Sequence, residues 1–219
     1  MSIKLYKMDP SPPARAAMLA CEIFNVQAEF IDVNLAAGEH LKPEYLKLNP
    51  CHTVPVLVDG DLILHDSQAI LMYLADTYGN NSALYPKEVK QRALVNQKLF
   101  FNSSVLFPRL RNVTYPIFMK GAKGVTEDQL NDIEDAYKLL ETFLSKTKYL
   151  AGNNITIADI AAFTTVSGLF YINPLKVESY PKLNAWAKEM ENKPYCQKLN
   201  APGATFLGEF VKKAISQQS

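Results

Sequence analysis

Ser11 lies in a short turn where its hydroxyl group could meet an anion. The segment before it, 3–8, has the pattern of a strand, and the segment after it, 14–24, has helical spacing. Ligands bind at the carboxyl ends of strands in open parallel sheets, and the positive end of a helix favours negative charge. Ser11 is therefore a candidate hydrogen-bond donor to an anion. Serine is also a preferred N-cap residue, and capping alone would explain its position.

Val54-Pro55 is the second feature that could do chemistry. Proline is confined to the edges and beginnings of strands, so Pro55 marks the start of one. A cis bond here would turn the backbone N–H and C=O of Val54 outward, where they could pair with an extended peptide. The sequence does not establish the isomer, and an ordinary proline at a strand entry is the alternative.

Asp66 and Ser67 stand directly before a helical pattern. The N–H groups of a helix N-terminus can hold a carboxylate, and Asp66 could hold an ammonium group, so the pair suits the zwitterionic end of an amino acid. A plain capping pair, with Ser67 as the cap, is the alternative. His40 and His52 lie in polar loops, and each could bond a terminal carboxylate. These residues together describe a cradle for a short peptide whose middle points at Ser11.

The order of elements predicts what positions the cradle. A strand at 3–8, a helix at 14–24 and a strand at 28–33 form a βαβ unit. Residues 34–50 are polar and too irregular for one long helix, and two apolar runs, 54–58 and 62–64, flank an Asp-Gly hairpin signal. With the helix after Asp66, this is the order of an α/β thioredoxin-like domain.

A polar stretch then separates the part of the chain with strand and helix patterns from a part with helical periodicity alone. We expect a domain at 1–79, a linker at 80–87 and a second domain at 88–219. Helical periodicity covers 90–119, 126–147 and 156–171, a further helix starts at Tyr180-Pro181 and ends near Lys193-Pro194, and a last amphipathic helix covers 204–215. The second domain is therefore predicted to be an all-α helical bundle.

Composition excludes several classes of function. The chain has 219 residues, a hydrophobic share of 48% and a net charge of +1, which gives no reason to expect a nucleic-acid partner. No apolar run approaches the roughly 18 residues that cross a bilayer, and the N-terminus lacks the apolar core of a signal peptide. We expect a cytoplasmic protein without membrane insertion. Three cysteines with no close pair argue against a disulfide framework and against zinc, so no metal is expected.

Three segments carry a family resemblance. Residues 11–16 (SPPARA), 49–57 (NPCHTVPVL) and 65–70 (HDSQAI) resemble the glutathione-binding motifs of cytosolic glutathione transferases, most closely the insect epsilon class and next the delta class. Residues 84–86 (LYP) are similar to the family's linker, and residues 155–159 (ITIAD) to its N-capping box and hydrophobic staple. The resemblance runs from about Lys4 to about Phe210.

The resemblance implies roles for the cradle. Ser11 would be the catalytic serine that holds the sulfur of glutathione, the co-substrate, as a thiolate. The implied glutathione-binding residues are His40, His52, Thr53, Val54, Pro55, Asp66, Ser67 and Arg111. Asp66 departs from the family's usual Glu and shortens the reach to the γ-glutamyl amine by one methylene, so weaker glutathione affinity is expected at most. Cys51 stands where Gln is common. The family also implies a homodimer.

A hydrophobic electrophile would bind beside the sulfur, between the two domains. Its predicted walls are Pro10, Leu106, Phe107, Leu110, Thr114, Phe118, Phe206 and Phe210. Each aromatic residue among them has an equally good explanation as bundle core. Conjugation of xenobiotics, hydroperoxide reduction and dehydrochlorination of insecticides are all open to such a site, because the last needs only a thiolate acting as a base.

Two other functions stay open on the same scaffold. A glutathione-dependent isomerase or a steroid-pathway enzyme would keep the glutathione site and change the pocket. A non-catalytic ligand carrier would bind glutathione without lowering the pKa of its thiol. The presence of Ser11, His52 and Ser67 weighs against the carrier.

Overall fold

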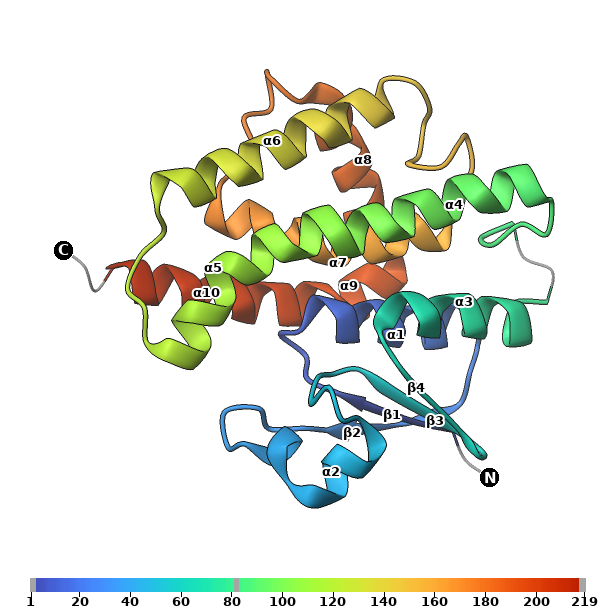
Figure 1. Ribbon diagram of the computed structural model, residues 1–219. Coiled ribbons are helices and arrows are strands. Elements are labelled where there is room, and N and C mark those ends of the chain that lie inside the picture. The colour runs from blue at the N-terminus through green and yellow to red at the C-terminus, as the bar shows by residue number, and fades with distance from the viewer. Residues whose placement is uncertain (1–2, 81–82, 217–219) are drawn as a thin grey trace.

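The computed structural model describes residues 3–80 and 83–216. Asn81 and Ser82, which belong to the predicted linker 80–87, lie outside the described residues. Figure 1 shows a small sheet at one end of the molecule and a larger group of helices at the other, with α1 and α3 between them. This confirms the predicted thioredoxin-like region followed by a helical bundle.

The sheet has four strands in the order β2-β1-β3-β4. Their bounds are β1 Ile3–Lys7, β2 Ala28–Asp32, β3 Val56–Asp59 and β4 Leu62–His65. β1 pairs with β2 in parallel and with β3 antiparallel, and β3 pairs with β4 antiparallel. The expected hairpin is present, with Gly60 at a φ of 63°, a conformation that glycine adopts at little cost.

Four short and medium helices belong to this region. They are α1 Pro12–Ile23, η1 Glu39–Leu41, α2 Pro43–Leu48 and α3 Ser67–Tyr78. α2 lies on the side of the sheet away from α1 and α3 (Figure 1). The chain between β2 and β3 is therefore irregular, as expected, but it carries two short helical turns that place the loop holding His52.

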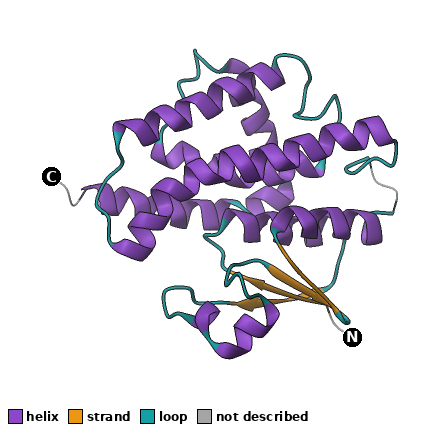
Figure 2. Cartoon of the chain, in the orientation of Figure 1, coloured by secondary structure: helices purple, strands orange, loops and turns teal. Residues whose placement is uncertain are grey.

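The remaining described chain is helical, apart from its connections (Figure 2). Its elements are α4 Val89–Phe101, η2 Asn102–Leu106, α5 Phe107–Lys120, α6 Glu127–Leu144, α7 Ile157–Ile172, α8 Pro181–Glu191, α9 Pro194–Leu199 and α10 Ala201–Ser216. No helix among residues 3–80 and 83–216 combines the length and apolar character needed to span a bilayer.

The helix boundaries correct the sequence reading in two places. The single helix expected over 90–119 is interrupted by η2, a π-helical segment just before Pro108, whose missing N–H prevents the regular helical hydrogen bond there. The short helix α9 was not expected, and α10 begins at Ala201 rather than Ala204 because its first turn continues directly from α9.

α7 is the central helix of the bundle. Its residues from Ile157 to Val166 are all buried, and it packs on α1, α4 and α10. Small side chains of α1, including Ala16, Ala17 and Ala20, allow the close approach of the two helices. One apolar cluster consequently runs from the sheet side through α1 into the bundle.

Asp159 holds the beginning of α7. Its carboxylate accepts hydrogen bonds from the N–H and hydroxyl of Thr156, at 2.9 and 3.0 Å. The Leu150 N–H and the Trp186 indole N–H also donate to it, both at 3.0 Å. The resemblance places an N-capping box here, and the bond from the Thr156 N–H to the Asp159 carboxylate confirms it.

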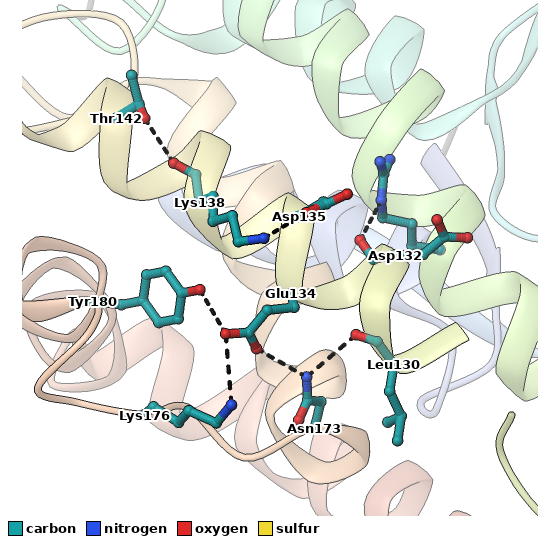
Figure 3. A network of polar contacts seen from close by, with 10 residues as sticks. Leu130, Asp132, Glu134, Asp135, Lys138, Thr142, Asn173, Lys176 and Tyr180 are labelled. Carbon is teal, nitrogen blue, oxygen red and sulfur yellow. Dashed lines mark hydrogen bonds and ion pairs between the residues drawn. The ribbon is translucent and has the colours of Figure 1, made fainter. Parts of the chain in front are cut away.

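Polar contacts on the outside of the bundle join α6 to the chain after α7 (Figure 3). The Glu134 carboxylate accepts from the Tyr180 hydroxyl at 2.6 Å and from the Asn173 amide at 3.3 Å. Lys176 lies 3.8 Å from the same carboxylate. This network sets the position of the long connection between α7 and α8.

Candidate active site

Ser11 is the N-cap of α1, and it is only half-buried. Its Oγ accepts a hydrogen bond from the Ala14 N–H at 3.5 Å, the long limit for such a bond. Among the described residues, no group accepts a hydrogen bond from the Ser11 hydroxyl. The capping role therefore exists and is weak, and the O–H remains able to donate to a ligand at the positive end of α1.

Val54 lies two residues before β3 and packs in a small apolar cluster with Ala14 of α1. The Val54–Pro55 bond is cis. The N–H and C=O of Val54 have no hydrogen-bond partner within residues 3–80 and 83–216, and the side chain is buried. An extended peptide running past β3 could pair with both groups in the manner of an added strand.

The loop from Asn49 to Thr53 is held by buried polar side chains. The Asn49 amide donates to the backbone oxygen of Thr53 at 2.9 Å and to its hydroxyl at 3.0 Å. The Tyr45 hydroxyl donates to the same backbone oxygen at 2.7 Å. Asn49 opens the motif 49–57 found in the sequence, whereas Tyr45 lies outside it, and an aromatic residue in an irregular segment gives no signal of such a role.

His52, in this loop, lies near His40 of η1. Their ring centroids are 6.2 Å apart, and His52 has a φ of 47°, unusual for a non-glycine residue. His40 is buried, and its Nδ1 has no partner among the described residues. Burial first, and then the neighbouring His52, lower the pKa of His40 below its ordinary value. His40 is therefore neutral at pH 7, and His52 is the exposed member of the pair.

Asp66, and not Ser67, caps α3. Its φ of 72° turns the carboxylate back over the helix end, where Oδ1 accepts from the N–H groups of Gln68 and Ala69 at 2.8 and 3.3 Å. Ser67 is the first helical residue and is buried. The expectation that Ser67 is the cap is wrong, because the positive φ falls one residue earlier. Strained backbone of this kind is common at functional sites.

Gln68 belongs to the same corner. Its amide nitrogen donates to the Ser67 Oγ at 3.2 Å, whereas its buried Oε1 has no partner in the part of the chain that the structure describes. The N–H of Ser67 is also without a partner there. A buried polar atom without a partner is costly, so this corner has the chemistry of a site that a polar ligand completes.

Arg111 lies outside the hydrogen-bonded groups described above, and its predicted contact with glutathione stays a prediction. It is exposed on α5, and its guanidinium lies over the ring of Tyr115, 4.4 Å from the centroid. No contact connects it to Ser11, Asp66 or His52 within the described residues. In the same part of the chain, no group of three or more His, Cys, Asp or Glu side chains is arranged to hold a metal ion.

The predicted electrophile pocket divides into two groups. Phe118 of α5 and Phe210 of α10 stack with centroids 4.1 Å apart, while Phe206 is 56% exposed. Leu106 and Leu110 are 0% and 1% exposed, so, against expectation, they present no surface to a pocket. Both belong to the apolar core because η2 and α5 turn this face toward α7. Pro10, Phe107 and Thr114 are half-buried.

Comparisons with known proteins agree with this arrangement. The family model described as "Glutathione S-transferase, N-terminal domain" matches residues 1–76, and that described as "Glutathione S-transferase, C-terminal domain" matches residues 105–194. Glutathione S-transferase 1 of Manduca sexta is 40% identical over 218 residues, which are 99% of this chain and 100% of that protein.

Solved structures are similar over nearly the whole chain. An epsilon-class glutathione S-transferase from housefly, Musca domestica, has a TM-score of 0.95 at 41% identity, covering 97% of this chain and 98% of that one. Glutathione transferase E6 of Drosophila melanogaster has a TM-score of 0.94 at 38% identity, with 97% of each chain covered. A glutathione transferase homologue from Drosophila mojavensis with bound glutathione has a TM-score of 0.94 at 39% identity, covering 98% of each chain.

A thioredoxin-like sheet region that carries a polar cradle, followed by an all-helical region, defines the two-part fold of glutathione-using transferases. The chain belongs to the glutathione S-transferase family. It is a transferase enzyme whose similar structures include epsilon-class members, with delta-class members also present. The resemblance stated from the sequence motifs is confirmed.

Proposed function

We propose that the Ser11 hydroxyl donates a hydrogen bond to the sulfur of glutathione and holds it as a thiolate, which then attacks a hydrophobic electrophile. The observation that carries this proposal is a half-buried hydroxyl at the N-terminus of α1 whose hydrogen is not used by any described residue. The thiol proton passes to solvent, and the sulfur lone pair forms the new bond. The leaving group, such as chloride, departs with its electron pair.

The energies involved are sufficient without a separate base. A free thiol has a pKa of about 8.5, and lowering it by about two units stabilises the thiolate by roughly 2.7 kcal/mol. A hydrogen bond to a charged acceptor contributes about 1.5–3 kcal/mol. The positive end of a helix adds up to about 1 kcal/mol. Ser11 thus acts as a stabilising donor rather than as a nucleophile.

The proposed orientation of glutathione uses the unpaired groups of the cradle. The backbone of the tripeptide runs along Val54. Its α-amino group meets the Asp66 Oδ2, since Oδ1 is occupied by two backbone N–H groups, and its α-carboxylate meets the N–H and hydroxyl of Ser67. The glycine carboxylate lies toward His52, with His40 behind it. The relative from Drosophila mojavensis with bound glutathione supports the choice of co-substrate.

A pH titration tests the proposed activation. Thiolate absorbance of enzyme-bound glutathione in the ultraviolet should rise with an apparent pKa of about 6.5, two units below the free thiol. The kcat/KM for a chloro-nitrobenzene should rise through the same pH, because the thiolate is the reactive form. Glutathione in buffer is the reference. Binding of glutathione with a thiol pKa near 8.5 would contradict the proposal and favour a non-catalytic carrier.

The electrophile is proposed to bind near the stacked pair Phe118 and Phe210, beside Pro10 and Phe107. Replacing Phe210 with alanine is expected to raise the KM for the electrophile by about fivefold to tenfold, because burial of an aromatic side chain contributes roughly 1–2 kcal/mol. The KM for glutathione should stay within about twofold. Phe206→Ala is the matched control, since Phe206 lies on the same helix but stacks on no ring within residues 3–80 and 83–216. Equal effects of the two variants would show that the stacked pair does not line the pocket.

Detoxification of hydrophobic electrophiles is the biological role that we propose, with dehydrochlorination or hydroperoxide reduction as side activities of the same thiolate. We further propose a homodimer, as is typical of the family. The exposed apolar residues Leu94 and Phe100 on α4 support it, because exposed large apolar side chains on one helix favour a protein interface. The division at 80–87 is likewise proposed as the domain boundary.

A further inference from the structure

A buried guanidinium lies directly behind the Ser11 turn. Arg15, on the first turns of α1, is 0% exposed and is one of the largest fully buried side chains of the protein. Within residues 3–80 and 83–216 it forms no ion pair with a carboxylate. Burial lowers the pKa of Arg15 to about 9. A buried charge without a counter-ion is costly, so its hydrogen bonds need an explanation.

The first set of these hydrogen bonds goes to the backbone just before Ser11. Nη1 of Arg15 donates to the carbonyl oxygen of Pro10 at 2.8 Å and to that of Asp9 at 3.3 Å. These two peptides form the turn from β1 into α1. The guanidinium therefore restrains the two residues that lead directly to the catalytic serine.

The second set goes to the helical region. Nη2 donates to the carbonyl oxygen of Thr164 in α7 at 2.8 Å, and Nε donates to Oδ1 of Asn200 at 2.8 Å. Asn200 is 2% exposed, and its own amide donates to the Ser167 hydroxyl at 3.2 Å. One planar guanidinium thus bridges α7, the start of α10 and the Ser11 turn, in the fork geometry that only arginine provides.

A glycine of α10 contacts the same turn from a second direction. An added Cβ at Gly203 would lie 2.1 Å from the Asp9 carbonyl oxygen and 2.9 Å from the Arg15 Cδ. The helix backbone therefore packs directly on the peptide that Arg15 holds. The helical region determines the position of this turn both through hydrogen bonds and through contact.

We propose that Arg15 is a positioning residue for the thiolate donor: anchored by Thr164 and Asn200, it fixes the Asp9 and Pro10 peptides and thereby the direction of the Ser11 hydroxyl. This inference rests on the proposed function of Ser11. The turn needs such a restraint, because the bond by which Ser11 caps α1 is long. At the other end of the turn, the ion pair between Lys7 and Asp9 restrains it little, since the Asp9 side chain is 56% exposed. A misplacement of about 1 Å can cost roughly 100-fold in rate.

The test compares Arg15→Lys with two other variants of the full chain. Lysine keeps the charge but cannot form four hydrogen bonds in the arginine geometry. We expect the thiol pKa of bound glutathione to rise by about one unit and kcat near pH 6.5 to fall by about fivefold or more. The glutathione KM should change by less than about threefold, because the cradle residues are untouched. Gly203→Ala keeps the arginine but presses on the Asp9 peptide and on the Arg15 Cδ, so the same two readouts are expected to move in the same direction.

Arg92→Lys is the matched control. The Arg92 guanidinium also forms several hydrogen bonds, donating to the Pro86 carbonyl at 2.8 Å and to both carboxylate oxygens of Asp76. Arg92 lies on α4, however, and does not contact the Ser11 turn. It should leave the thiol pKa unchanged. A folded Arg15→Lys enzyme with the wild-type thiol pKa and kcat overturns the inference. If Arg15→Lys does not fold, Gly203→Ala decides: a wild-type titration overturns the inference, and a raised pKa supports it.

A parallel titration of Ser11→Ala distinguishes the proposed role of Ser11 from the proposed role of Arg15. If Ser11→Ala keeps the lowered thiol pKa, the proposed function itself fails, whatever Arg15→Lys does. If Ser11→Ala loses the lowered pKa and Arg15→Lys retains it, the proposed function stands and the role of Arg15 is rejected.

Discussion

Replacing Ser11 with alanine is expected to lower kcat/KM for conjugation near pH 6.5 by about 100-fold, because removal of one donor to a developing or stored anion typically costs about 100-fold to 1,000-fold. The fold should survive. The capping bond that is lost measures 3.5 Å, so its share of the free energy of unfolding is small. The thiol pKa of bound glutathione should return to near 8.5.

The pH profile distinguishes loss of activation from general damage. The deficit of Ser11→Ala should shrink above about pH 8.5, where the thiol ionises without help. Ser145→Ala is a suitable control, since that serine is exposed and its hydroxyl donates to the Glu141 carbonyl at the end of α6. A Ser11→Ala enzyme that turns over within about twofold of wild type near pH 6.5 would remove Ser11 from the mechanism.

Replacing Asp159 with alanine is expected to lower the free energy of unfolding by about 3–5 kcal/mol, more than any other substitution considered for this protein. The carboxylate accepts four hydrogen bonds, from Leu150, Trp186 and twice from Thr156, and is 0% exposed. Alanine leaves four buried donors unpaired and removes the N-terminal anchor of α7, the helix on which α1, α4 and α10 pack.

Urea unfolding followed by the fluorescence of Trp186 measures this effect, because the indole itself donates to Asp159. The midpoint should fall by about 1–2 M if the slope is roughly 3 kcal/mol/M. Asp135→Ala provides the contrast, since that carboxylate is 60% exposed and forms an ion pair with Lys138 on the surface of α6. A midpoint for Asp159→Ala equal to that of Asp135→Ala would show that the four contacts contribute little.

Local chemistry explains why most elements could be predicted from the chain. Pro12 and Pro13 start α1 where Ser11 caps it, and Gly60 permits the hairpin between β3 and β4. The failures have equally local causes. Pro108 breaks an otherwise continuous helical pattern into α4, η2 and α5, and the sequence period alone does not reveal a π-helical segment.

The candidate site shows where sequence patterns stop being informative. Ser67 and Asp66 are both acceptable caps, and the choice of Asp66 follows from a φ of 72° that the turn from β4 into α3 imposes. Leu106 and Leu110 have the spacing of a pocket wall, but the same spacing fits the core, and only the packing against α7 decides between them. Phe118 and Phe210 meet only because α5 and α10 lie together.

The sequence by itself determined the family and the two kinds of region, and it singled out Ser11, Val54 and Asp66 as candidates, since motifs and periodicity depend on neighbours along the chain. The tertiary structure alone decided the role of Arg15, which looks like an ordinary residue of α1. Its partners Thr164 and Asn200 lie 149 and 185 residues away. Contacts over such separations depend on how helices pack, which no local pattern encodes. The direction of the Ser11 hydroxyl is therefore set by the helical region, although the serine itself belongs to the sheet region.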